Sequence, residues 1–366
     1  MARVHAFAPE WVSPPGETIS DLLTERGWTQ SDLAERTGFT RKHVNEVVQG
    51  KASVTSDTAL RFEAVLGSTA GFWLRREANY REALERSRTR DEDRTAAGWL
   101  RELPIPYLVK QGVIRRFRHR GDQVRECLRC FGVASVPAWR ATYEGPLADF
   151  RASPKVPKRA GAIAAWIRCA EIKAARIDCA PFDRKRFRAA LGAVRQLTLE
   201  VNPIEFVPRM QALFASAGVA CVVVAPPPPG CPVSGAARWL SPDKAMIALS
   251  FRHRADDHLW FTVFHEAAHV LLHGKRLWHI DTDSTASSQS EDEANRFARE
   301  LLMPGIGADE LREASGSPTA IRRLASKLGI APGIIVGRMQ REEVLGWNHM
   351  NTLKIRYDAA VVSALA

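Results

Sequence analysis

Apolar positions recur at helical spacing over most of the chain, and short continuous apolar runs interrupt that spacing only in its second half. The helical spacing predicts several short helices between residues 17 and 84, and a further group from residue 160 onward. The runs at residues 219–224 and 245–250 predict a buried strand and the second strand of a hairpin. We therefore expect a multidomain, mainly α protein with one small sheet.

Residues 29–50 have the pattern of two short helices joined by a tight turn. Leu33 and Val44 are expected in the core, and Gly38 can adopt the left-handed conformation that such a turn requires. Thr40 is expected to begin the second helix, so that polar and basic residues cluster near the exposed N-terminal end of that helix. The other helices that would bury this pair are expected at residues 55–66 and 72–84.

The polar residues of this pair of helices are of the types that proteins use to contact DNA. Arg41 and Lys42 suit guanine edges or phosphates, and Asn45 suits adenine. The alternative is a helix pair kept for dimerisation or partner docking, with Arg41 and Lys42 as solvated charge. The candidate DNA-binding residues are Gln30, Thr40, Arg41, Lys42 and Asn45.

Residues 257–274 are apolar on nearly all sides and are expected to form a buried helix. Asp256 and Asp257 place negative charge at its N-terminal end, and Gly274 is expected to cap its C-terminal end. His273, just before that glycine, is expected to cap backbone carbonyls rather than to bind a metal.

The same helix contains His265, Glu266 and His269 in the spacing His-Glu-x-x-His. Four residues advance a helix by slightly more than one turn, so the two imidazoles share a face and can bind one metal ion. Glu266 lies beside the first ligand, where a general base could reach a water on the metal. The alternative is that both histidines are ordinary core residues with backbone partners.

A catalytic zinc usually has three protein ligands, so a further ligand is expected downstream. The helical spacing of residues 291–304 makes Glu293 the expected third ligand, because it precedes Phe297 by four residues. Glu291 is the second choice. Ser290 and Glu293 also fit a capping box, in which Glu293 would bind backbone instead of metal.

These motifs, with residues 239–250 and 293–304, resemble the ImmA/IrrE family of bacterial zinc metallopeptidases over roughly residues 155–345. The resemblance implies a zincin-like α+β domain whose small sheet packs over the helix of His265 and His269. It implies that these histidines and Glu293 bind Zn²⁺ while Glu266 acts as base; Mn²⁺ or Fe²⁺ would accept the same ligands. Asn295 stands where many relatives have Asp, which puts less negative charge beside a ligand.

Residues 15–85 resemble the lambda-repressor-like helix-turn-helix of XRE regulators. They are most similar to HigA-type antitoxins, notably in Pro14-Pro-Gly-Glu17 and Gly71-Phe-Trp-Leu74. This resemblance implies a double-stranded DNA operator as partner and a homodimer if the operator is palindromic.

Composition and charge agree with a globular protein of two or three domains. The 366 residues carry a net charge of +11, which favours polyanionic partners, although the basic cluster at residues 115–129 is expected to be a solvated face. No apolar run could cross a membrane and no targeting pattern precedes the first helix, so a cytoplasmic protein without membrane partners is expected. Among six cysteines only Cys127 and Cys130 have metal-ligand spacing, and free thiols are favoured.

The expected organisation is a helix-turn-helix domain at residues 1–98, a helical connector at 99–154 and a metallopeptidase domain at 155–366, with the second boundary near residues 152–157. The expected function is that of a DNA-binding regulator with a zinc endopeptidase domain, which the family resemblance directs at a repressor or toxin–antitoxin protein. The alternative is a regulator or antitoxin whose peptidase fold serves as a sensor or docking module without turnover.

Overall fold

The structure is a computed structural model that describes residues 13–144, 160–274, 279–282 and 289–365. The chain divides into two compact units, one formed by residues 1–97 with 120–122 and the other by residues 98–119 with 123–366. The expected boundary near residues 152–157 lies outside the described residues, and the division into three domains remains a prediction.

The first unit is a bundle of helices with the expected helix-turn-helix at its centre. Each of the four helices after the first is preceded by a threonine whose side chain accepts a hydrogen bond from a backbone amide of the first turn. These threonines are Thr29, Thr40, Thr55 and Thr69. The helices are α1 (Pro15–Arg26), α2 (Gln30–Thr37), α3 (Arg41–Val48), α4 (Ser56–Leu66) and α5 (Ala70–Thr95), and α5 runs well beyond the expected end at residue 84.

The turn between α2 and α3 has the geometry that the sequence predicts. Gly38 has a φ of 71° and ends α2, and Leu33 and Val44 are buried. Arg61 of α4 holds this turn by donating a hydrogen bond of 2.9 Å to the carbonyl of Thr37. Gly16 allows close contact between α1 and α3, because a Cβ there would lie 1.8 Å from the carbonyl oxygen of Val48.

Short helices follow in residues 96–144, and most of these residues belong to the second unit. Tyr107 donates a hydrogen bond of 2.9 Å to the carbonyl of Ala225, which ties this region to the sheet. Cys127 and Cys130 are buried free thiols, as expected, and burial raises the pKa of Cys127 to about 12. The elements are η1 (Ala96–Arg101), α6 (Ile105–Lys110), α7 (Arg120–Phe131), α8 (Val136–Trp139) and η2 (Arg140–Glu144).

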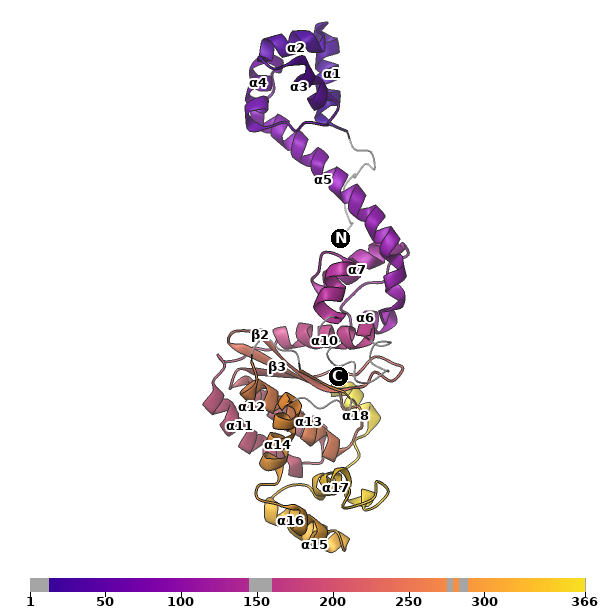
Figure 1. The fold of residues 1–366 in the computed structure, drawn as a ribbon, viewed down its shortest axis with the longest axis vertical. Coiled ribbons are helices and arrows are strands. Elements are labelled where there is room, and N and C mark those ends of the chain that lie inside the picture. Colours follow the sequence, from indigo (N-terminus) through magenta and orange to yellow (C-terminus); the bar gives the residue numbers. More distant parts are fainter. Residues whose placement is uncertain (1–12, 145–159, 275–278, 283–288, 366) are drawn as a thin grey trace. The chain divides into compact units, whose positions relative to one another are not determined.

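A four-stranded sheet organises the second unit, with strand order β1-β3-β2-β4. β3 pairs in parallel with β1 and antiparallel with β2, and β2 pairs antiparallel with β4. Helix α10 packs on one face, while α12 and α13 pack on the other (Figure 1), which explains why β1 is buried along its whole length. The bounds are α10 (Ala160–Ala175), α11 (Arg184–Gln196), η4 (Leu197–Leu199), α12 (Pro203–Ala215), β1 (Val219–Val223), β2 (Val233–Ser241), β3 (Lys244–Leu249), α13 (Asp256–Leu272) and β4 (His279–Thr282).

The expected hairpin is β2 and β3, and β3 leads directly into α13 as predicted. The strand β4 was not expected, because residues 279–282 belong to a largely polar segment. Gly274 does not cap α13 in a left-handed conformation; the helix ends at Leu272, with His273 in extended conformation as its C-cap.

The C-terminal helices cover the core of the second unit. Pro332 begins α17, because a proline at the first helical position has no amide hydrogen to satisfy. The pair α16 and α17 resembles α2 and α3 in its turn, with Gly329 at a φ of 65°, yet the buried Ile334 and Ile335 pack α17 into the core rather than leaving it free to enter a DNA groove. The elements are α14 (Gln289–Leu302), α15 (Ala308–Ala314), α16 (Pro318–Leu328), α17 (Pro332–Arg341), η5 (Asn351–Leu353) and α18 (Ala359–Leu365).

Within the described ranges, none of the helices combines the length and apolar character needed to span a membrane.

Candidate metal centre and DNA-reading helix

Helix α13 carries the His-Glu-x-x-His residues in the centre of the second unit. Sheet residues cover it on one side and α14 and α17 cover it on others, so that His265 and His269 are 3% and 2% exposed. Buried imidazoles require polar partners, and here those partners come mainly from α14.

Glu291 of α14 completes a compact group with the two histidines. Nε2 of His265 lies 3.0 Å from Nε2 of His269 and 3.1 Å from Oε2 of Glu291. The other carboxylate oxygen, Oε1, lies 3.4 Å from Nε2 of His269. Among the described residues, these three side chains form the one group of His, Cys, Asp and Glu side chains whose ligand atoms converge enough to hold a metal ion.

The donor set fits a zinc ion. A tetrahedral ion with bonds of about 2.0–2.1 Å holds its ligand atoms about 3.3 Å apart. The separations within this group, 3.0, 3.1 and 3.4 Å, are close to that value. Three protein ligands also leave a fourth position for a water or a substrate oxygen, as catalytic zinc sites require.

The structure places Glu291, the second choice, in this group, and it does not place the expected ligand Glu293 there. The side of α14 that is buried against its neighbours carries Ala294, Ala298 and Leu302, and Glu291 and Asn295 continue that stripe toward α13. Our prediction followed the larger apolar residues Phe297 and Leu301, which are only partly buried. Glu293 instead contacts His273 and Gln289, and Ser290 lies within α14 rather than in the position before the helix that a capping box requires.

Asn295 of α14 contacts the first histidine of the motif. Its Oδ1 lies 3.2 Å from Nδ1 of His265. Because an amide oxygen only accepts hydrogen bonds, the proton of His265 belongs on Nδ1, and Nε2 keeps its lone pair for a metal. Asn295 therefore orients this histidine without adding a negative charge.

Glu266 lies beside this group without belonging to it, as a general base would. Its side chain is fully buried and packs against Gly235 of β2. A Cβ at Gly235 would lie 2.8 Å from Oε1 of Glu266 and 2.5 Å from Cγ2 of Thr262. The glycine thus leaves the space that the Glu266 carboxylate occupies, a requirement that the sequence alone did not reveal.

The ionisation of the group suits metal binding at neutral pH. Burial favours the neutral form of Glu291, but its polar contacts with the imidazoles of His265 and His269 outweigh burial and hold the pKa of Glu291 well below its usual range. Burial also lowers the pKa of His269, so its imidazole is neutral and available as a ligand near pH 7.

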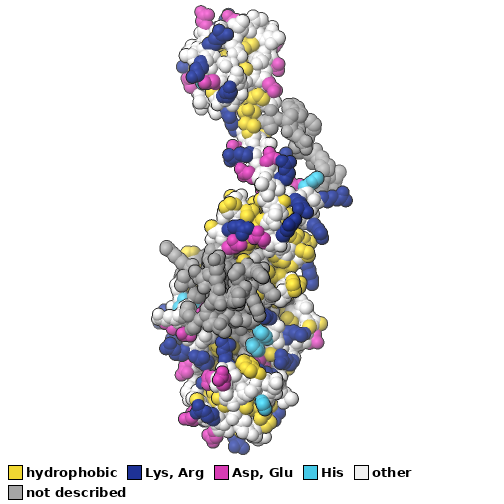
Figure 2. Space-filling view, turned by 45° about the vertical axis from the view of Figure 1, so that its right-hand side comes forward, with side chains coloured by type: hydrophobic (Ala, Val, Ile, Leu, Met, Phe, Trp, Pro, Cys, Tyr) yellow, Lys and Arg dark blue, Asp and Glu magenta, His cyan; other side chains and the backbone are white. Residues whose placement is uncertain are grey.

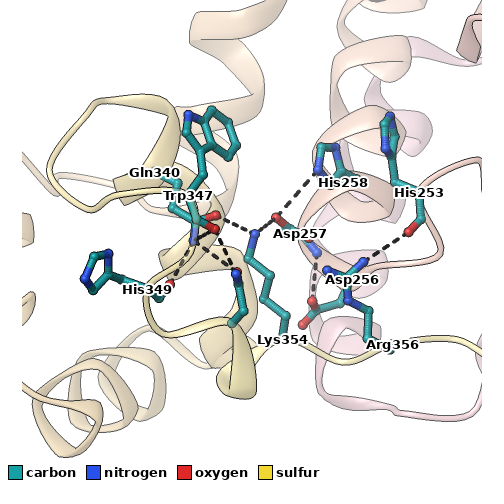
Figure 3. A network of polar contacts seen from close by, with 10 residues as sticks. His253, Asp256, Asp257, His258, Gln340, Trp347, His349, Lys354 and Arg356 are labelled. Carbon is teal, nitrogen blue, oxygen red and sulfur yellow. Dashed lines mark hydrogen bonds and ion pairs between the residues drawn. The ribbon is translucent and has the colours of Figure 1, made fainter.

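The N-terminal end of α13 is anchored by a buried polar network (Figure 3). Lys354 lies between Asp257 and Gln340, with its Nζ 2.6 Å from Oδ2 of Asp257 and 2.7 Å from Oε1 of Gln340. Gln340 in turn donates to the carbonyl of His349 at 2.9 Å. Burial and the neighbouring Asp257 carboxylate raise the pKa of Asp256 to about 7. The network fixes the start of the helix that carries the histidines, and neither Lys354 nor Gln340 could be assigned to it from local sequence patterns.

The predicted DNA-binding residues lie in α2 and α3 of the first unit or immediately before α3. Arg41 and Lys42 are exposed at the start of α3, and Thr40 caps that helix by accepting a hydrogen bond from the amide of His43. Asn45 is half-buried and accepts a hydrogen bond from Gln49, which sequence reasoning had not considered. Gln30 is half-buried at the start of α2.

The surface of this unit is not uniformly basic. Figure 2 shows Lys and Arg side chains interspersed with acidic ones on it. Glu46, one turn after Lys42, lies 3.9 Å from its ammonium group. Any preference for DNA must therefore come from the side chains that α3 presents rather than from a broad electrostatic field.

Comparison with protein families assigns both regions. Residues 233–340 match the IrrE N-terminal-like domain of the peptidase M78 family, and residues 19–73 match a helix-turn-helix family. Among solved structures, an addiction module antidote protein of the HigA family from Coxiella burnetii is 26% identical, covering 21% of this chain and 86% of its own, with a TM-score of 0.21. A search of curated proteins gave no match.

Proposed function

We propose that this chain, which joins an XRE-type helix-turn-helix domain at residues 19–73 to an ImmA/IrrE-like peptidase domain at residues 233–340, is a DNA-binding regulator that also hydrolyses a protein substrate in a zinc-dependent reaction. The observation that carries the proposal is the convergence of His265, His269 and Glu291 with Glu266 beside them on α13.

Each residue of the centre has a separate task in this reaction. When bound, a zinc ion would lower the pKa of a coordinated water to about 7 and polarise the substrate carbonyl. The Glu266 carboxylate accepts a proton from the attacking water and then returns it to the leaving amine. His265 and His269 present Nε2, and Glu291 adds the negative charge that a dication needs. Burial shields the Glu266 carboxylate from bulk water.

The first unit would bring this activity to an operator in double-stranded DNA. In such a complex α3 enters the major groove, where Arg41 and Asn45 contact base edges and Lys42 contacts phosphate. Gln30 and Thr40 would contact the backbone at the groove edge. A palindromic operator would be bound by a homodimer, and the substrate would be a repressor or a toxin–antitoxin component.

The catalytic part of this proposal can be tested without knowing the natural substrate. The zinc-loaded protein is incubated with a peptide library from a digested bacterial proteome, and new N-termini are identified by labelling and mass spectrometry. We expect wild type to generate new termini that Glu266→Gln and chelator-treated wild type do not. Identical termini from Glu266→Gln, or none from any sample, would instead support a sensor or docking module without turnover.

A further inference from the structure

His273 and Glu293 extend the metal centre outward from His269. Nδ1 of His269 lies 2.9 Å from Nδ1 of His273, and Nε2 of His273 lies 3.3 Å from Oε2 of Glu293. The three side chains thus form a continuous line from the ligand group to a carboxylate on α14. Neither His273 nor Glu293 belongs to the ligand group itself.

One arrangement of protons satisfies every contact along this line. Nε2 of His269 faces His265 and Glu291, so as a ligand it carries no proton, and the proton of His269 is on Nδ1. This Nδ1–H donates to Nδ1 of His273, which must accept. The proton of His273 is then on Nε2, where it donates to the carboxylate of Glu293, a group that only accepts.

The local backbone holds His273 in place for this role. His273 follows the last residue of α13, and its amide donates to the carbonyl of His269 at 3.2 Å. Its side chain is only 8% exposed. Glu293 is held from its other oxygen by Gln289, whose amide donates to Oε1 at 2.9 Å.

The two histidine ligands are therefore supported differently. His265 donates its Nδ1 proton directly to the neutral amide oxygen of Asn295. His269 reaches a negative charge, but through a second imidazole. A carboxylate behind a metal-binding histidine fixes its tautomer and increases its basicity.

We propose that His273 and Glu293 are positioning residues that act as one hydrogen-bonded relay on His269 and thereby set how tightly the centre holds its metal. This inference rests on the proposed zinc site of His265, His269 and Glu291. It assigns Glu293 a role behind a ligand rather than as one, and gives His273 a function other than that of a carbonyl cap.

The test compares zinc affinity in the full chain by competition with a chromophoric chelator. Glu293→Ala, His273→Ala and the double variant are measured beside wild type, with Glu300→Gln as control because Glu300 is an exposed glutamate on the same helix. We expect each single variant to bind zinc about 10–100-fold more weakly. The double variant should match the weaker single variant, because both residues act through the same contact.

A second measurement reads the positions of the protons directly. Long-range ¹H–¹⁵N NMR spectra of histidine-labelled, zinc-loaded protein report which ring nitrogen carries the proton, and we expect Nδ1–H for His269 and Nε2–H for His273. Loss of this pattern in Glu293→Ala, with an unchanged melting temperature, separates positioning from a general effect on folding.

The outcomes distinguish the relay from the site on which it depends. Wild-type zinc affinity in Glu293→Ala, or losses that multiply in the double variant, would overturn the relay while leaving the zinc site intact. Failure of the wild type to bind zinc would overturn both, and affinity in Glu291→Ala equal to that of wild type would overturn the proposed ligand set.

Discussion

Oδ1 of Asn295 lies 3.2 Å from Nδ1 of His265, so an amide occupies the position at which a carboxylate would add negative charge to the centre. The contact fixes the orientation of the His265 ring. In the proposed zinc site, the missing charge would make His265 a weaker metal ligand than it would be beside a carboxylate.

Substitution of Asn295 should therefore change metal affinity in both directions. Asn295→Asp is expected to strengthen zinc binding, because a carboxylate stabilises the positive charge that develops on His265. Asn295→Ala is expected to weaken binding about 10–100-fold. Isothermal titration of the apoprotein measures both effects, and equal affinities in all three proteins would show that the contact has no influence on the metal.

Gly235 should matter for catalysis although it binds nothing. In Gly235→Ala the new Cβ would contact Oε1 of Glu266 and Cγ2 of Thr262, both of which would have to move. We expect peptide cleavage to fall by about 10²-fold or more, because a displaced base loses its alignment. Zinc stoichiometry should stay unchanged, and Gly192→Ala serves as control because a Cβ at Gly192 meets open space. Full cleavage activity in Gly235→Ala would contradict this role.

The proposed role of α3 in contacting bases predicts a loss of DNA affinity when its polar side chains are removed. An operator is first selected from random duplex DNA with the full chain, and binding is then compared by fluorescence anisotropy. Arg41→Ala and Asn45→Ala should each cost about 1–3 kcal/mol at the selected sequence. Arg75→Ala, an exposed arginine on α5, is the matched control. Unchanged affinity in both α3 variants would show that this helix does not contact the bases.

Asp256 makes stability depend on pH. Burial and the charge of Asp257 raise its pKa from 3.8 to about 7, so the folded protein retains a proton that the unfolded chain has lost. This contribution to the free energy of unfolding is present below pH 3.8 and decreases as pH rises toward 7, by up to ~1.4 kcal/mol per pH unit. Urea unfolding between pH 5 and 8 should show a smaller decrease in Asp256→Asn than in wild type. The control Asp309→Asn, at a fully exposed position, should show the same pH dependence as wild type. If the stability of Asp256→Asn decreased with pH as steeply as that of wild type, Asp256 would not be the source of the pH dependence.

The sequence predicted those parts of the fold that depend on short-range patterns. The helix-turn-helix, the hairpin and the two histidines on one face of α13 all follow from spacing within a few residues. The place of Glu291 beside the two histidines did not, because Ala294 and Ala298 define the packed face of α14 and small residues give a weak periodic signal beside Phe297 and Leu301. The contact of Lys354 with Asp257 joins residues 97 positions apart, so only the tertiary structure reveals it.

The identity of the third ligand is the most direct test of the proposed centre. Elemental analysis of purified wild type, Glu291→Ala and Glu293→Ala, each equilibrated with a slight excess of zinc at micromolar concentration and desalted, measures zinc per chain. We expect about one zinc ion in wild type, little in Glu291→Ala, and a partly or fully retained ion in Glu293→Ala. Full zinc in Glu291→Ala together with complete loss in Glu293→Ala would contradict the centre described here.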